Sequence, residues 1–298
     1  MNKYVLIGLS IVVLLGIGVG AVARYSNDSQ ANLAQIPAQT PLPFRSDFAN
    51  MRIESEAKLV VPPAILEDVW AYMLRRLVTD KTFLKSLDPN LDSYWNDEIF
   101  NDIYYDTPDL VMLDHQSGIR YRTRTNLTNP ESTKNGRELL QVKLNDVDSD
   151  VFSRGEIKFD IHHDLKPDDP DDLQPALGLL KTSDRPQFKQ LMAELSINPY
   201  SLKPILTLDQ RRRSIYITRN GDAFISVRLD QDSSDMLWAG WRHFEIEPEL
   251  NEIPFTAADD AGKAYMQDIN SKILKDILQK AFHFAGGHFI PLLYQLIR

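Results

Sequence analysis

The sequence contains no cysteine in 298 residues. This absence excludes disulfide bonds, zinc sites with thiolate ligands, iron–sulfur clusters and a cysteine nucleophile. It is compatible with either side of a bacterial inner membrane, so it does not assign a compartment. The mean hydropathy is also low, at −0.30, which excludes a protein with many membrane spans.

Positive charge is in deficit. Lysine and arginine total 33 against 42 aspartates and glutamates, which gives a formal net charge of −9. This balance argues against non-specific binding of nucleic acid, and no nucleic-acid partner is expected. The hydrophobic share of 43% is ordinary for a folded protein. The length allows two domains, or one larger barrel or sandwich.

One apolar run stands at the N-terminus. Residues 4–23 carry no charge, and about 20 such residues span a bilayer as a helix. Ala21-Val22-Ala23 also fits a cleavage site, so residues 1–25 are predicted to be a transmembrane anchor or a signal peptide. The α-amino group and Lys3 before the run, against Arg24 and then Asp28 after it, favour a cytoplasmic N-terminus. The membrane is then a partner of this helix, and the soluble part is expected to be periplasmic or otherwise extracytoplasmic.

The rest of the chain divides into a linker and a working domain. Residues 26–48 are rich in Ala, Gln, Pro and Ser without an amphipathic period, which is typical of a flexible linker. Residues 49–298 form the predicted domain. Period-two alternation predicts strands at Arg52–Val60, Ile119–Thr125, Leu139–Leu144, Gly155–Ile161, Leu206–Thr218, Ala223–Leu229 and His243–Glu249. Helices are predicted at 63–78, 184–195 and 258–284, and an acidic surface loop at 163–173.

The predicted strands pair an apolar face with a strongly charged one. Arg120, Arg122 and Arg124 share a face of one strand, as do Glu245 and Glu247 of another. A solvated outer sheet face is one interpretation. Nearly every position of these faces is charged, which favours a second interpretation, in which they line the lumen of a barrel. Buried charges must be paired or bind a charged ligand. A metal-bound polyphosphate satisfies both kinds of charge, because carboxylates hold divalent cations and arginines hold phosphate oxygens.

Short motifs along the chain resemble one known family. They are Glu54-Ser-Glu56-Ala-Lys58 (E-x-E-x-K), Tyr104–Leu110 (YYDTPDL), Gly118–Arg124 (GIRYRTR), Lys143, Arg154-Gly155-Glu156, Arg211 after Pro204, Leu229-Asp230 and Glu245–Glu249 (EIEPE). In this order, from about residue 52 to 250, the chain resembles the CYTH proteins, or triphosphate tunnel metalloenzymes. It departs from their pattern at Lys158 and Ser226, where an acid is common, and at Pro248, which is expected to interrupt the last strand.

The resemblance implies an α+β fold, with a closed or nearly closed antiparallel eight-stranded β-barrel, a charged lumen and flanking helices. It implies a Mg²⁺ or Mn²⁺ site made by Glu54, Glu56, Asp230, Glu245 and Glu247. It implies phosphate binding by Lys58, Arg122, Arg124, Lys143, Arg154 and Arg211. The residues it implies for catalysis are Glu54, Glu56, Lys58 and Glu156.

The implied activity is that of a divalent-metal-dependent triphosphatase. Its substrate is inorganic triphosphate, a polyphosphate, or a nucleoside or thiamine triphosphate. One alternative is a cyclase of the same family that makes cyclic AMP, which needs a base-binding pocket that the sequence does not identify. Another alternative is a membrane-tethered module that binds or polymerises polyphosphate. The sequence leaves the choice of triphosphate, the metal and the oligomeric state open.

Overall fold

The computed structural model describes residues 52–56, 59–115, 117–145, 152–163, 168–235 and 241–284. The predicted anchor and linker, and Lys58, lie outside the described residues. Within the described ranges, no helix is both long enough and apolar enough to cross a bilayer.

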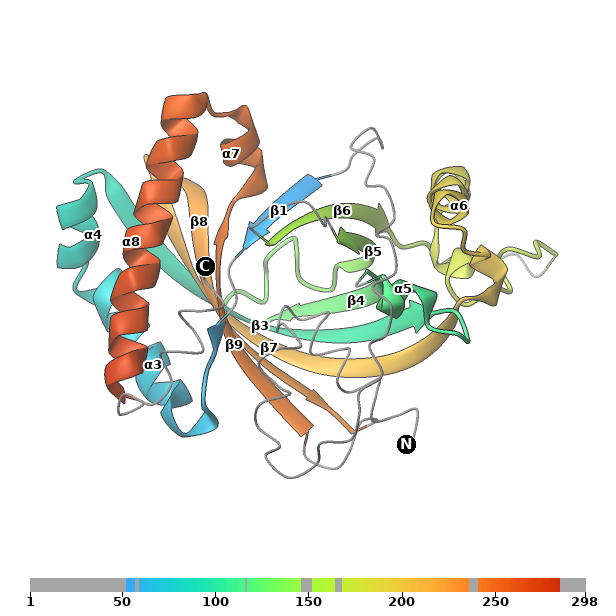
Figure 1. The fold of residues 1–298 in the computed structure, drawn as a ribbon, viewed down its shortest axis with the longest axis horizontal. Coiled ribbons are helices and arrows are strands. Elements are labelled where there is room, and N and C mark those ends of the chain that lie inside the picture. Colours follow the sequence, from blue (N-terminus) through green and yellow to red (C-terminus); the bar gives the residue numbers. More distant parts are fainter. Residues whose placement is uncertain are drawn as a thin grey trace, which may run out of the picture.

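The described residues form one antiparallel sheet of nine strands that curls on itself (Figure 1). The strands are β1 (Arg52–Glu56), β2 (Leu59–Val60), β3 (Leu91–Asp106), β4 (Gly118–Asn126), β5 (Glu138–Asn145), β6 (Phe152–Asp160), β7 (Lys203–Arg219), β8 (Asp222–Ser234) and β9 (Trp241–Leu250). Their order is β1-β6-β5-β4-β3-β7-β8-β9-β2. Because β1 and β2 follow each other in the chain and both pair with β9, they count as one position. The prediction of an eight-stranded antiparallel sheet is confirmed in this sense.

The sheet does not close through a continuous ladder. Among the described residues, β1 pairs with β6 over five residues and meets β9 at the pair Glu56 and Glu249. β2 adds the pairs of Leu59 with Ile246 and of Val60 with Glu245. The closed form of the predicted barrel is therefore corrected to a curled sheet that these pairs do not close along a continuous ladder. Pro248 does not interrupt β9 itself, which continues to Leu250.

Strand β3 was not predicted from the sequence. It pairs with β7 along its whole length and with β4 over its second half, so it lies at the centre of the sheet. Its sequence, LDSYWNDEIFNDIYYD, contains several Asp and Asn residues, which are depleted in strands. The long pairing with both neighbours outweighs this weak local preference. β3 brings Glu98, Phe100 and Asp102 into the curl of the sheet.

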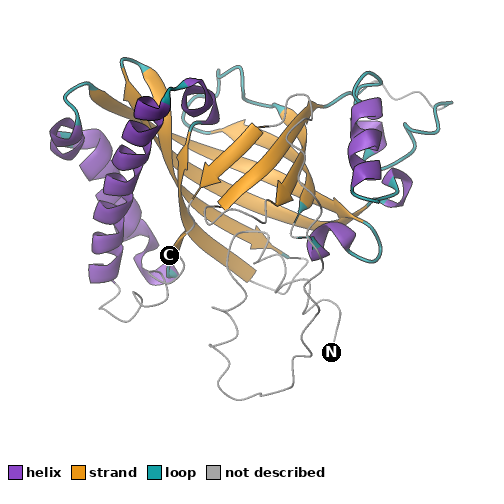
Figure 2. Cartoon of the chain, turned by 45° about the horizontal axis from the view of Figure 1, so that its top comes forward, coloured by secondary structure: helices purple, strands orange, loops and turns teal. Residues whose placement is uncertain are grey.

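Helices cover the outside of the sheet at both ends (Figure 2). They are η1 (Pro63–Ile65), α3 (Leu66–Met73), η2 (Leu74–Thr79), α4 (Thr82–Leu87), α5 (Val111–Asp114), η3 (Leu177–Leu179), α6 (Arg185–Glu194), η4 (Pro199–Ser201), α7 (Glu252–Ala257) and α8 (Asp260–Phe284). The three predicted helices correspond to the η1–α3–η2 run, to α6 and to α8. Residues 164–167 of the predicted acidic loop lie outside the described ranges.

The hydrophobic core lies outside the curl, between the sheet and these helices. Met73 of α3 and Ile273 of α8 are fully buried against Val227 of β8. A second cluster packs Phe188 of α6 against Ile157 of β6. The apolar strand faces therefore point outward and the charged faces point inward, as the density of charge predicted.

Truncating Ile273 to alanine should lower the free energy of unfolding by about 2–5 kcal/mol, because it leaves a cavity under α8. Chemical denaturation measures this change. Lys272→Ala, at the exposed neighbouring position, should shift the midpoint little. Equal midpoints for Ile273→Ala and the wild type would contradict the packing of α8 on the sheet.

Candidate functional site

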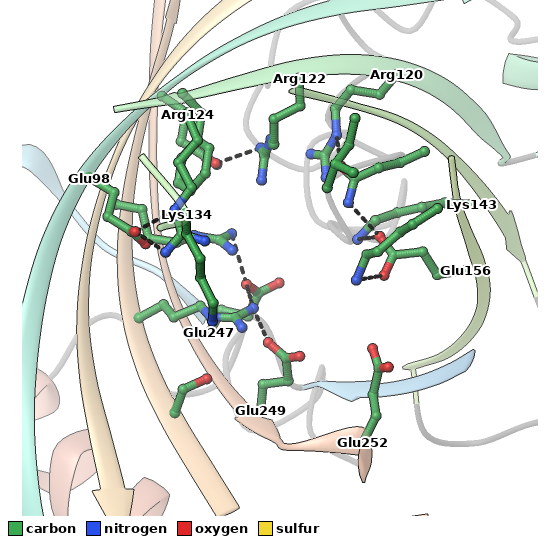
Figure 3. A pocket seen from close by; sticks show the side chains of 18 of the residues that line it. Glu98, Arg120, Arg122, Arg124, Lys134, Lys143, Glu156, Glu247, Glu249 and Glu252 are labelled. Carbon is green, nitrogen blue, oxygen red and sulfur yellow. Dashed lines mark hydrogen bonds and ion pairs between the residues drawn. The ribbon is translucent and has the colours of Figure 1, made fainter. Parts of the chain in front are cut away.

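A cavity of about 650 Å³ lies inside the curl of the sheet (Figure 3). Its lining in the described part of the chain carries nine cationic and seven acidic side chains, although the whole chain is acidic. The cations are Arg120, Arg122, Arg124, Lys134, Arg137, Lys143, Lys158, Arg212 and Arg228, and the acids are Glu98, Glu156, Asp160, Glu245, Glu247, Glu249 and Glu252. The cavity therefore offers a polyanion a local excess of positive charge.

Asp102 of β3 holds two of the arginines of β4. It is 1% exposed and accepts hydrogen bonds from Arg122 Nε at 2.6 Å and from Arg120 Nη1 at 3.3 Å. Burial alone would raise the pKa of Asp102, but the positive charges of Arg122 and Arg120 outweigh it, so the pKa lies below its usual value. The guanidinium groups are thereby fixed in orientation before any ligand binds.

Phe100 lies among three guanidinium groups. The central carbon of Arg122 lies 4.2 Å from the centre of the ring, and those of Arg124 and Arg212 lie 5.8 Å from it. Cation–π attraction offsets part of the repulsion between like charges. Glu98 adds to this, because it accepts from Arg124 Nε at 2.6 Å. Arg122 and Arg124, both predicted to bind phosphate, thus lie together in the cavity with Arg212.

Glu156 of β6 organises the lysines on the opposite wall. It is 1% exposed, accepts from Gln141 Nε2 at 3.0 Å and lies 3.9 Å from Lys143 Nζ. It also forms an ion pair with Lys158. Lys143 and Glu156, predicted as a phosphate ligand and a catalytic residue, therefore lie side by side (Figure 3). Lys158, a departure from the family pattern, is explained by this pair, since an acid there would repel Glu156.

The carboxylates of β9 form the third wall. Glu245, Glu247 and Glu249 alternate along the strand and line the cavity. Arg212 Nη2 donates to Glu247 at 3.1 Å, and Arg228 Nη1 lies 3.3 Å from the same carboxylate. Arg228 also pairs with Glu249. Arginines therefore already partner part of the acidic set.

The predicted metal ligands are partly brought together. Asp230 of β8 is fully buried opposite Glu245 and accepts from Arg212 Nε at 2.8 Å. The backbone of Glu54 pairs with that of Arg154, and the backbone of Glu56 pairs with that of Glu249. The side chains of Glu54, Glu56 and Arg154 lie outside the described part of the structure. Among the residues whose positions are described, no group of three or more acidic or histidine side chains is placed to hold a metal ion.

The chemistry of the donors nevertheless fits a hard divalent cation. All the carboxylates here offer oxygen ligands, which Mg²⁺ prefers. Asp232, next to Asp230 in this face of β8, is 2% exposed, and its Oδ2 has no hydrogen-bond partner among the described residues. Burial and the charges of Asp230 and Glu245 raise the pKa of Asp232 to about 7. Acidic side chains of β8 and β9 therefore gather close together beside this end of the cavity.

Arg211 does not line the cavity. Its Nε and Nη2 donate to Asp97 at 3.1 Å and 2.7 Å on the outer face of the sheet. Arg212, the next residue, points inward instead, and Arg213 binds Glu67 of α3. Neighbouring residues of a strand point to opposite faces. The sequence analysis expected Arg211 in the lumen, whereas the structure places the next residue, Arg212, in the cavity lining.

Other cavity residues were not among the predicted site residues. Arg120 and Arg228 belong to alternating faces that the sequence does display, whereas Glu98 lies on the unpredicted strand β3. Asp102, which holds Arg120 and Arg122 from behind, lies on the same strand. Lys134 enters the cavity from the loop between β4 and β5, for which the sequence offers no periodic signal.

The Tyr104–Leu110 motif has mainly a structural role. Asp106 accepts backbone N–H groups of Thr107, Met112 and Leu113 at 2.7, 2.9 and 3.0 Å. It thereby holds the short helix α5 at the corner between β3 and β4. Tyr104 lines the cavity.

Replacing Asp102 with asparagine should lower the free energy of unfolding by about 3–5 kcal/mol, because two buried arginines lose their charge partner. The carboxylate, with its lowered pKa, stabilises the fold above the unfolded-state pKa of about 3.9, and this contribution is lost as the pH falls through the lower folded-state value. The difference between wild type and Asp102→Asn in chemical denaturation should therefore shrink at acid pH. Asp92→Asn, at an exposed pair with Lys81, is the control. A difference that stays constant with pH would contradict this role.

The solved structures to which this chain is similar share little sequence with it. An adenylate cyclase candidate from Bacillus halodurans is 16% identical over 76% of this chain and 91% of its own, with a TM-score of 0.41. An adenylyl cyclase candidate from Hippeastrum, described as having a dominant triphosphatase activity, is 14% identical over 80% and 98%, with a TM-score of 0.43. The Pct1 RNA triphosphatase of S. pombe is 12% identical over 84% and 81%, with a TM-score of 0.30.

The sequence comparisons assign the family. A search of curated proteins finds no match. The family model of the CYTH domain matches residues 73–272, about two-thirds of the chain. The chain therefore belongs to the CYTH family.

Proposed function

We propose that the protein hydrolyses a phosphoanhydride bond of a triphosphate bound in the cavity. The observation that carries this proposal is the convergence of nine cationic side chains on one cavity, with the arginines of β4 held in place by buried carboxylates. Pre-oriented guanidinium groups suit phosphate oxygens, which they bind in bidentate fashion. Membership of the CYTH family supports the same substrate class.

The cations divide into three groups around the ligand. Arg122 and Arg124, held by Asp102 and Glu98, bind the non-bridging oxygens from one wall. Lys143 of β5 and Lys158 of β6 approach from the opposite wall. Lys134, which makes no ion pair within the described structure, reaches in from its loop. Together they stabilise the charge that develops on the transferred phosphoryl group and on the leaving phosphate.

Arg212 and Arg228 line the cavity and are paired with the carboxylates of β8 and β9. In this structure they bind Asp230, Glu247 and Glu249. A triphosphate in the cavity would compete with these carboxylates for Arg212 and Arg228. Asp230, Glu245 and Glu247, with Glu54 and Glu56 of β1, would be the residues that hold Mg²⁺ or Mn²⁺. When bound, the ion neutralises phosphate charge and lowers the pKa of a bound water.

Arg212 and Arg211 provide a matched pair of variants. Arg212→Ala should lower kcat/KM for inorganic triphosphate about 10²–10³-fold, because it removes a charged donor from the reacting phosphates. Arg211→Ala should retain the wild-type value within about twofold, since this arginine lies on the outer face. Phosphate release with Mg²⁺ and with Mn²⁺ measures both, and circular dichroism checks folding. Equal losses in the two variants would contradict the assignment of the inner face.

Neutralising the predicted cation ligands tests the metal dependence. Glu54→Gln and Glu247→Gln each remove one charged oxygen ligand, so the concentration of Mg²⁺ or Mn²⁺ that gives half-maximal phosphate release should rise at least about tenfold. Titration of the metal at saturating triphosphate measures this. Full rate with an unchanged metal requirement in both variants would overturn the assignment of these carboxylates.

A further inference from the structure

A pair of tyrosines lies at one end of the cavity. Tyr216 of β7 lines the cavity and stacks on Tyr94 of β3, with ring centres 5.0 Å apart and planes at 21°. The two residues are direct partners in the ladder, and Ser226 of β8 is the next partner across the sheet. Ser226 also lines the cavity and places a neutral hydroxyl beside the rings. The rings therefore add an aromatic surface to this end of the cavity, where Glu249 of β9 is the next partner of Ser226 across the sheet.

Large apolar side chains at this end of the cavity are exposed to solvent. Tyr94 is 52% exposed, and Ile253, which lines the same cavity, is 66% exposed. Neither tyrosine hydroxyl has a hydrogen-bond partner among the described residues. Tyr200, another exposed tyrosine, differs, because its hydroxyl contacts Lys189 and Asp171. Exposed apolar side chains that gather at the edge of a cavity mark binding surfaces.

The spacing relates the tyrosines to the phosphate site. Tyr216 lies four residues beyond Arg212 on β7, which corresponds to about 13 Å along an extended strand. Both residues alternate onto the inner face. A triphosphate held at Arg212 and Arg124 can therefore extend an organic group along β7 to the rings, whereas inorganic triphosphate has no group to place there.

We propose that Tyr94 and Tyr216 form a stacking subsite for a nucleobase, so that the substrate is a nucleoside triphosphate. The proposal rests on the phosphate site of the proposed function. The base extends the existing stack of two phenol rings, an arrangement that tolerates different bases because each has a π-face. The free hydroxyls lie at the edge of the stack, where they can bond to polar atoms of the base or ribose.

Kinetics of the full-length chain with ATP and with inorganic triphosphate test this subsite. Tyr216→Leu and Tyr94→Leu should each raise KM for ATP about tenfold and leave kcat/KM for inorganic triphosphate within about twofold. Tyr216→Phe should keep the wild-type KM within about threefold, because the ring remains. Tyr200→Leu is the matched control at an exposed tyrosine outside the cavity, and it should change neither substrate. Equal changes for both substrates, or no change for ATP, would overturn the proposal.

Calorimetric binding of the imido analogue of ATP and of inorganic triphosphate separates this proposal from the proposed function. The wild type should bind the ATP analogue about tenfold more tightly, and Tyr216→Leu should remove this difference. If inorganic triphosphate is hydrolysed but the ATP analogue binds no more tightly, the subsite is wrong and the triphosphatase stands. If neither ATP nor inorganic triphosphate is hydrolysed but the preference for the ATP analogue persists and depends on Tyr216, the triphosphatase is wrong and the subsite stands.

Discussion

Buried carboxylates that hold arginines and lysines are the interaction on which the rest of the cavity depends. Asp102, Glu98 and Glu156 are each no more than 2% exposed. An isolated charge at such depth costs several kcal/mol, and each of these acids has a cation beside it that offsets this cost. The cations in turn keep one orientation because the acids are fixed on rigid strands. Because these guanidinium groups are already ordered, they lose little further conformational freedom when a phosphate ligand binds.

This requirement explains why the sheet curls with its charged faces inside. If the apolar faces pointed into the curl instead, the rows of arginine and glutamate would point outward. The helices would then have no apolar sheet face to pack against. Here the apolar faces point outward and bury Met73, Ile273 and Phe188 against α3, α8 and α6. The hydrophobic effect therefore acts between sheet and helices. The interior is free to be polar, and pairing rather than packing decides its arrangement.

The two ends of the cavity differ in chemistry. Near one end, Asp230 and Asp232 of β8 lie beside Glu245 of β9, and Arg212 donates to Asp230. The other end carries the ring of Tyr216, stacked on Tyr94, and the exposed Ile253, next to Glu249 and Glu252. The cations between them therefore connect a cluster of carboxylates, suited to a divalent ion, with the aromatic surface proposed for an organic group.

The sequence alone determined the alternation of charge on seven strands, the inward turn of those faces and the short motifs of the CYTH family, because side chains two residues apart share a face of any extended strand. It could not show that residues 91–106 form the central strand, since Asp and Asn are weak strand formers, and only pairing with β4 and β7 overcomes that preference. It could not choose between Arg211 and Arg212, because the face of each depends on a register set by β3 and β8. The stack of Tyr94 on Tyr216 joins residues 122 positions apart in the chain. The pair of Glu56 and Glu249 joins the first strand of the chain to the last one. Such contacts between distant segments have no local signal, so the tertiary structure alone decided them.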